Sequence, residues 1–81
     1  MLTTSEMEST TRRVVAAHFK KDPRALDLAM RLREDLGGDS LDLIELLFVL
    51  EQETGATIPD ADAAGLVTLG DVVRYVESAR G

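Results

Sequence analysis

Cysteine and tryptophan are absent from the 81-residue sequence, and His18 is its only histidine. Without cysteine the chain can form no disulfide, offers no thiolate ligand to a metal and holds no thiol nucleophile. A single imidazole also excludes a metal site built on a pair of histidines. We therefore expect no resident metal and no catalysis carried out by this chain alone.

Long apolar runs are also absent. The longest uninterrupted apolar stretch covers residues 46–50, which is far too short to cross a bilayer. Residues 1–13 are polar and lack the apolar segment of a secretory signal. These features predict a soluble, cytoplasmic protein that does not enter a membrane.

The composition is that of a folded chain. Hydrophobic residues make up 44% and charged residues 30%, with two prolines, so disorder is not expected. A chain of 81 residues has room for a single small core. We therefore predict one domain over residues 1–81, stabilised by its core without covalent cross-links.

The net charge of −6 is unevenly distributed along the chain. Residues 1–33 hold seven of the nine basic residues and four of the fifteen acids, whereas residues 34–81 hold two basic residues and eleven acids. An acidic surface repels nucleic acids and anionic membranes and attracts basic partners. A second interpretation is that the acids only keep the surface hydrated.

Apolar spacing and capping signals predict helices. Apolar residues recur at helical spacing between Met7 and Phe19. Ser5 and Glu8 have the spacing of a capping box, in which two side chains satisfy each other's backbone at a helix start. The Asp-Pro pair that follows interrupts the pattern, and residues 24–35 show no clear period, which predicts a long loop with at most one helical turn.

Further capping signals divide the rest of the chain, where residues suited to helix starts alternate with glycines suited to helix ends. The start and end signals are Asp39 or Ser40 with Gly55, Asp60 with Gly65, and a capping box of Thr68 and Asp71. The predicted helices span about residues 5–19, 40–54, 60–64 and 68–79. Because no strand pattern is evident, we predict an all-α fold, a small antiparallel four-helix bundle with three main helices and one short helix.

The helix predicted over residues 40–54 is more apolar than a surface helix requires. Between positions 41 and 50 eight of ten residues are apolar, although a stripe on one face is enough to cover a core. The core face consists of leucines, namely Leu43, Leu46, Leu47 and Leu50. The other side carries an apolar ridge edged with acids, namely Leu41, Ile44 and Phe48 with Asp42 and Glu45. Either this ridge docks a partner with a basic rim, or the preceding loop covers it.

Ser40, at the start of this helix, has two interpretations. A serine in this position is usually an N-cap that accepts a hydrogen bond from a backbone N–H. The position also suits a covalent phosphate, since free amides and the helix dipole stabilise negative charge there. Gly37 and Gly38 leave room for the active site of another enzyme. No histidine lies near Ser40 in the sequence to activate it, so an outside enzyme would carry out the modification.

Residues 34–42, EDLGGDSLD, resemble the attachment motif of the acyl carrier proteins, small four-helix domains that hold acyl chains on a 4′-phosphopantetheine arm. The resemblance extends without a gap over residues 32–76, more than half of the chain. Its most specific part is Asp39-Ser40-Leu41, and Ile58-Pro59-Asp60 reinforces it at the expected distance.

The resemblance implies that a phosphopantetheinyl transferase attaches the arm from coenzyme A to Ser40, which Asp39 and Leu41 flank. Acyl groups would then travel as thioesters between acyl transferases, ketosynthases and related enzymes of fatty acid or polyketide biosynthesis, with the carrier acting as a monomer. The docking surface for the basic patches of these partners would comprise Asp39, Leu41, Asp42, Ile44, Glu45, Phe48 and Glu51. The interior pocket for the acyl chain would comprise Leu32, Leu47, Leu50, Ile58, Leu66, Val72 and Tyr75.

Other functions remain open at the level of the sequence. The chain departs from the family pattern before the motif, where Arg24, Arg31 and Arg33 make the segment more basic. An aminoacyl, peptidyl or specialised acyl carrier would share the motif. A helical interaction module that is never modified would share the fold, but it would bind its partners independently of Ser40.

Overall fold

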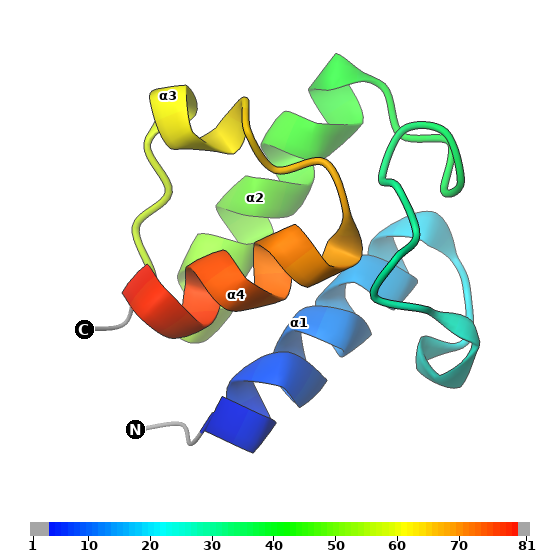
Figure 1. The fold of residues 1–81 in the computed structure, drawn as a ribbon, viewed down its shortest axis with the longest axis horizontal. Coiled ribbons are helices and arrows are strands. Elements are labelled where there is room, and N and C mark those ends of the chain that lie inside the picture. The colour runs from blue at the N-terminus through cyan, green and yellow to red at the C-terminus, as the bar shows by residue number, and fades with distance from the viewer. Residues whose placement is uncertain (1–3, 80–81) are drawn as a thin grey trace.

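The computed structural model describes residues 4–79. Its elements in chain order are α1 (Thr4–Phe19), the 3-10 turn η1 (Pro23–Ala25), α2 (Ser40–Thr54), α3 (Asp60–Ala63) and α4 (Leu69–Ala79) (Figure 1). In the described part of the chain, the only β-type pairing is an isolated antiparallel bridge between Arg31 and Thr68. The prediction of an all-α fold with three main helices and one short helix is confirmed.

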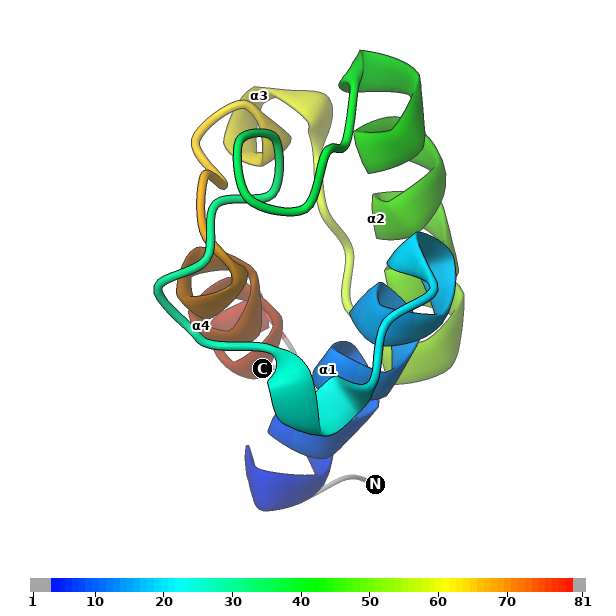
Figure 2. The same cartoon turned by 90° about the vertical axis from the view of Figure 1, so that its right-hand side faces the viewer.

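α1 is the helix that holds the other two long helices together. It packs against both α2 and α4, and η1 also contacts it. Figure 2 shows the loop of residues 20–39 running along one side of the molecule, from the end of α1 to the start of α2. In both views the start of α2 lies at the same end of the molecule as α3. The loop, the start of α2 and α3 therefore meet at one end of the bundle.

The core is formed by apolar side chains from the three long helices and from the loop. Its fully buried members include Met7, Val15, Leu32, Leu46, Leu50, Leu69, Val72 and Val76. Thr11 is also fully buried, and its hydroxyl donates to the carbonyl of Met7 at 2.7 Å, so the polar group is satisfied. The predicted core face of α2 is confirmed, since Leu43 and Leu47 pack partly buried against the same cluster.

α2 begins with a capping box. Asp39 is extended, and its carboxylate accepts a hydrogen bond from the backbone N–H of Asp42 at 2.8 Å. The Asp42 carboxylate accepts in return from the N–H of Asp39 at 3.3 Å. The helix ends at Gly55, whose φ of 78° lies in the left-handed region that glycine adopts without strain. Asp39 is therefore the N-cap, and the predicted range of residues 40–54 is confirmed.

The other two predicted capping boxes have different outcomes. α1 already includes Thr4, so Ser5 lies within the helix and the box of Ser5 with Glu8 is wrong. At the start of α4, the Thr68 hydroxyl accepts from the N–H of Asp71 and the Asp71 carboxylate accepts from the N–H of Thr68, both at 3.1 Å. Hydrogen bonds from the backbone, that of Thr68 first, lower the pKa of Asp71. Asp71 therefore stabilises the fold above about pH 4, and this contribution is lost as the pH falls through its lowered pKa.

The start of α3 differs from the prediction, because the N-cap is Pro59 rather than Asp60. The Pro59 carbonyl accepts from the N–H groups of Asp62 and Ala63 at 3.0 and 2.9 Å, so Asp60 is already helical. Its carboxylate makes no capping hydrogen bond, and the helix ends at Ala63 rather than at residue 64. Proline suits this start because its backbone angle is preset and it has no N–H to satisfy.

Two glycines shape the turn that leads into α2. Gly37 has a φ of 77°, which a side chain would make unfavourable. A Cβ atom at Gly38 would lie 2.9 Å from Cζ of Phe19 and 3.1 Å from the carbonyl oxygen of Leu32. The predicted turn is confirmed, but Gly38 is buried and faces α1 rather than opening the surface to another enzyme. This close packing holds the loop against α1 immediately before Ser40.

Candidate functional site

Ser40 is the first residue of α2 and is exposed. Because the Asp39 carboxylate caps the helix, the Ser40 hydroxyl is not required for that purpose. Its Oγ instead accepts a hydrogen bond from Nη2 of Arg33 at 3.1 Å. The interpretation of Ser40 as no more than an N-cap is therefore wrong.

The start of α2 favours negative charge. The N–H groups of the first helical turn lack partners within the helix, and the helix dipole places partial positive charge there. The Arg33 guanidinium, within hydrogen-bond distance of Ser40, adds a full positive charge. An exposed hydroxyl beside a cation and a helix N-terminus fits a covalently attached phosphodiester in both charge and space.

The apolar ridge on α2 is exposed to solvent. Leu41, Ile44 and Phe48 are 63%, 65% and 58% exposed, and Val49 beside them is 38% exposed. The preceding loop does not cover the ridge, but instead buries three of its leucines in the core. Val49 was assigned to neither face from the sequence, because helical spacing leaves it between the core face and the ridge.

The acids predicted for docking have different roles in the structure. Asp39 and Asp42 form the capping box, and Asp42 Oδ1 also lies 3.7 Å from Nε2 of His18. The Glu51 carboxylate accepts a hydrogen bond at 2.7 Å from a backbone N–H in the loop after α2. Glu45 is exposed and makes no such contact with the described residues. Of these four acids, Glu45 is therefore the one whose carboxylate makes no structural contact within the described residues.

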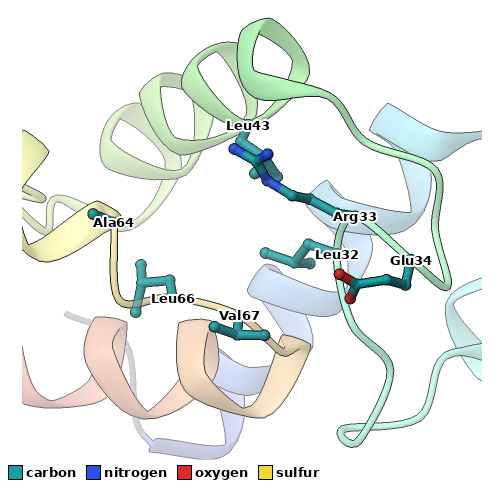
Figure 3. A pocket seen from close by; sticks show the side chains of 7 residues that line it. All are labelled: Leu32, Arg33, Glu34, Leu43, Ala64, Leu66 and Val67. Carbon is teal, nitrogen blue, oxygen red and sulfur yellow. The ribbon is translucent and has the colours of Figure 1, made fainter.

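A cavity of about 220 Å³ lies between the loop, α2 and the segment that follows α3 (Figure 3). Its lining consists of Leu32, Arg33, Glu34, Leu43, Ala64, Leu66 and Val67. Five of these seven residues are apolar, and the other two, Arg33 and Glu34, carry opposite charges. The cavity is smaller than the roughly 300–1,000 Å³ of sites for drug-sized ligands, so without opening it suits a short apolar chain.

The residues predicted for an acyl pocket divide between two hollows and a group that lines neither. Those in the cavity are Leu32 and Leu66. Those in a second hollow of about 170 Å³, beside the ridge, are Leu47 and Ile58. Those that line neither are Leu50, Val72 and Tyr75. The sequence argument missed Leu43 as a cavity residue because its helical position assigned it to the core.

A shallow groove of about 420 Å³ opens beside Ser40. Its lining consists of Arg33, Ser40, Leu43, Ile44, Leu47, Asp60, Ala63 and Ala64. Three of these residues, Arg33, Leu43 and Ala64, also line the cavity. The groove therefore extends from the Ser40 hydroxyl to the edge of the cavity.

Tyr75 on α4 donates a hydrogen bond from its hydroxyl to the Asp62 carboxylate on α3 at 2.5 Å. This bond, followed by reduced hydration and the charges of Asp62 and Glu51, raises the pKa of Tyr75 above 10. The raised pKa means that the contact contributes stability below pH 10, which is lost as the pH rises through the folded-state pKa.

We expect Asp62→Ala to lower the pKa of Tyr75 towards 10, because the acceptor and its charge are removed together. Since Tyr75 is the only tyrosine and the chain has no tryptophan, the ultraviolet absorbance of tyrosinate reports this one residue. Asp60→Ala, which removes a carboxylate from the same short helix, is the matched control. Equal titration midpoints in the two variants would contradict the contact.

Comparison with known proteins bears directly on this arrangement. The family model described as a phosphopantetheine attachment site matches residues 9–76, which include Ser40. The chain belongs to the acyl carrier protein family. It is 46% identical over 66 residues to the acyl carrier protein of Campylobacter concisus, covering 82% of this chain and 86% of that one. It is 34% identical over 76 residues to that of Sinorhizobium fredii, covering 94% and 97%.

A solved acyl carrier protein has the same fold. The structure from Enterococcus faecalis superposes with a TM-score of 0.82 at 28% sequence identity, covering 96% of this chain and 99% of that one. As a member of the acyl carrier protein family, the chain is a non-catalytic carrier with phosphopantetheine as its cofactor. A phosphopantetheinyl transferase and acyl-processing enzymes are the partners of such a carrier. The predicted family, fold class and cofactor are confirmed.

Among the helices of residues 4–79, none is long and apolar enough to cross a bilayer. Over the same residues, His, Asp and Glu side chains form no group of three or more that could hold a metal ion.

Proposed function

We propose that Ser40 is the residue that bears the 4′-phosphopantetheine arm, and that the protein serves fatty acid or polyketide biosynthesis as a cytoplasmic, monomeric acyl carrier. The observation that carries the proposal is the exposed Ser40 hydroxyl at the first position of α2. This hydroxyl does not cap the helix, because Asp39 is the N-cap. When attached, the arm supplies the thiol that this chain lacks and on which acyl groups are carried as thioesters.

The attachment of the arm is a substitution at phosphorus. Ser40 Oγ forms a bond to the phosphorus atom that bears the pantetheine part of coenzyme A. The bond between this phosphorus and the bridging oxygen of the diphosphate breaks, and adenosine 3′,5′-bisphosphate leaves with that oxygen and the electron pair. The hydroxyl proton passes to a base of the transferase. Ser40 is suited to this step because it is exposed and the helix start stabilises the phosphodiester product.

Incubation of the purified chain with coenzyme A and a broad-specificity phosphopantetheinyl transferase tests the proposal. We expect intact mass spectrometry to show the addition of one phosphopantetheine arm per chain. A chain that stays unmodified with several such transferases would overturn the proposal.

We propose further that the ridge of Leu41, Ile44 and Phe48 is the docking surface for these partners, with acids along its edge. The exposure of all three side chains supports this assignment, since exposed apolar groups of this size on one helix face are typical of interaction sites. Glu45 provides an uncommitted carboxylate beside them. A partner with a basic rim around an apolar depression would complement both features.

Glu45→Lys is expected to slow arm transfer and acyl transfer by roughly threefold to tenfold at low salt, because it reverses a charge at the rim of the interface. The reduction should shrink as salt is added. The matched control is Glu53→Lys, which makes the same charge change on α2. The Glu53 side chain lies away from the ridge, in a hollow that Arg13 and Val14 of α1 also line. If both variants reacted at the same rate with every productive partner, the ridge would not be the docking surface.

A further inference from the structure

Arg33 is the arginine that contacts Ser40, and it differs from most arginines of the described residues in forming no ion pair. Arginines that pair with a carboxylate within 4 Å are Arg12, Arg24, Arg31 and Arg74. Within residues 4–79, neither Arg13 nor Arg33 forms such an ion pair, but Arg33 donates a hydrogen bond from Nη2 to Ser40 Oγ. A guanidinium has five N–H donors, so most of those on Arg33 remain available beside the Ser40 hydroxyl.

The other charged side chains around Ser40 are acidic. Asp39 and Asp42 flank it in the sequence, and Asp60 lies on the opposite side of the groove. Among the described residues that line the groove, Arg33 is the only cation. A phosphodiester on Ser40 Oγ would therefore be repelled by these carboxylates and attracted by one side chain. Because Arg33 already contacts the oxygen that would bear the phosphorus, it needs little movement to reach the phosphate oxygens.

Figure 3 shows the Arg33 side chain extending from the loop to α2, where its guanidinium lies beside Leu43, above Leu32 in the cavity. Arg33 thus lines both the groove that opens at Ser40 and the cavity to which the groove leads. The positive charge of Arg33 therefore acts on any group that is attached to Ser40 and extends towards the cavity.

We propose that Arg33 is a positioning residue that binds the phosphodiester attached to Ser40 and thereby directs the start of the arm along the groove. The inference rests on the proposed function, because it requires the arm to be on Ser40. The contact would consist of charge-assisted hydrogen bonds, which the planar guanidinium donates to the phosphate oxygens. It explains why Arg33 lies in an acidic part of the surface without pairing with any carboxylate of residues 4–79.

The test compares Arg33→Gln with Arg31→Gln. Both variants lose one positive charge from the same loop, but the Arg31 side chain pairs with Glu34 and Asp35 instead of Ser40. Each protein, and the wild type, is prepared without and with the arm, and intact mass confirms the modification. The two readouts are the phosphorus NMR shift of the phosphodiester and the change in melting temperature that the arm causes.

We expect Arg33→Gln to move the phosphorus resonance, whereas Arg31→Gln should leave it at the wild-type position. The change in melting temperature caused by the arm should be lower by roughly 2–5 °C in Arg33→Gln than in Arg31→Gln. Arg33→Lys should retain part of both effects, since it keeps the charge and loses the fork. If the arm is added but the two glutamine variants agree in both readouts, the role of Arg33 is overturned and the proposed function stands. If even the wild type accepts no arm, the proposed function fails and the role of Arg33 with it.

Discussion

Ser40→Ala is expected to abolish addition of the phosphopantetheine arm while leaving the fold intact. The variant removes the one atom to which the arm is proposed to be attached, so intact mass after incubation with coenzyme A and a transferase should stay that of the bare chain. The capping box does not involve the Ser40 side chain, and alanine is a good helix former. The free energy of unfolding should therefore change by less than about 0.5 kcal/mol.

The control for this variant is Ser9→Ala. Ser9 is an exposed serine within a helix, like Ser40, but it lies on α1 outside the motif. The Ser9 variant should accept the arm at the wild-type rate. Addition of an arm to Ser40→Ala would show that another hydroxyl is the attachment site, whereas two unmodified variants beside a modified wild type would point to a nonspecific defect.

Leu46→Ala is expected to destabilise the protein by about 2–5 kcal/mol. Leu46 is 0% exposed and belongs to the core cluster, so alanine would leave a cavity that the surrounding helices fill only in part. Domains of this kind are stable by about 5–15 kcal/mol in total, and the loss is therefore a large share. Equilibrium unfolding in denaturant measures it as a fall in the midpoint at an unchanged slope.

Phe48→Ala on the same helix provides the comparison. Phe48 is larger than Leu46 but 58% exposed, so its truncation should lower the free energy of unfolding by much less. The same variant should weaken reactions with partners if the ridge is the docking surface. Equal losses of stability in the two variants would contradict the assignment of core and ridge faces on α2.

Most of the helical framework was predictable from the sequence because its signals act within one turn. α2 begins after Asp39 and ends before Gly55, as predicted. A carboxylate at the N-cap and a left-handed glycine at the C-cap act only on the backbone groups of neighbouring residues. Asp60 shows the limit of such signals. The N-cap of α3 is Pro59, one residue before the predicted cap, so the Asp60 carboxylate has no backbone N–H to cap.

The candidate site was also predictable only in part from the sequence. The motif around Ser40, the missing thiol and the acids near α2 are properties of the chain itself. Through the resemblance to the acyl carrier proteins, they indicated a carrier that acquires its thiol from outside. Whether the ridge on α2 is exposed could not be predicted, because an apolar helix surface is equally suited to a covering loop and to a partner. The fold decides this by burying the loop's own leucines and leaving Phe48 in solvent.

Contacts between distant segments were decided by the tertiary structure alone. Arg33 reaches Ser40 because Gly38 packs against Phe19 and holds the loop close to the start of α2. Glu51, which the resemblance assigned to the docking surface, accepts a hydrogen bond from the backbone of the loop after α2. The cavity joins side chains from three segments of the chain. Local propensities act over a few residues, whereas these contacts depend on how the helices pack around α1, so no pattern in the sequence could specify them.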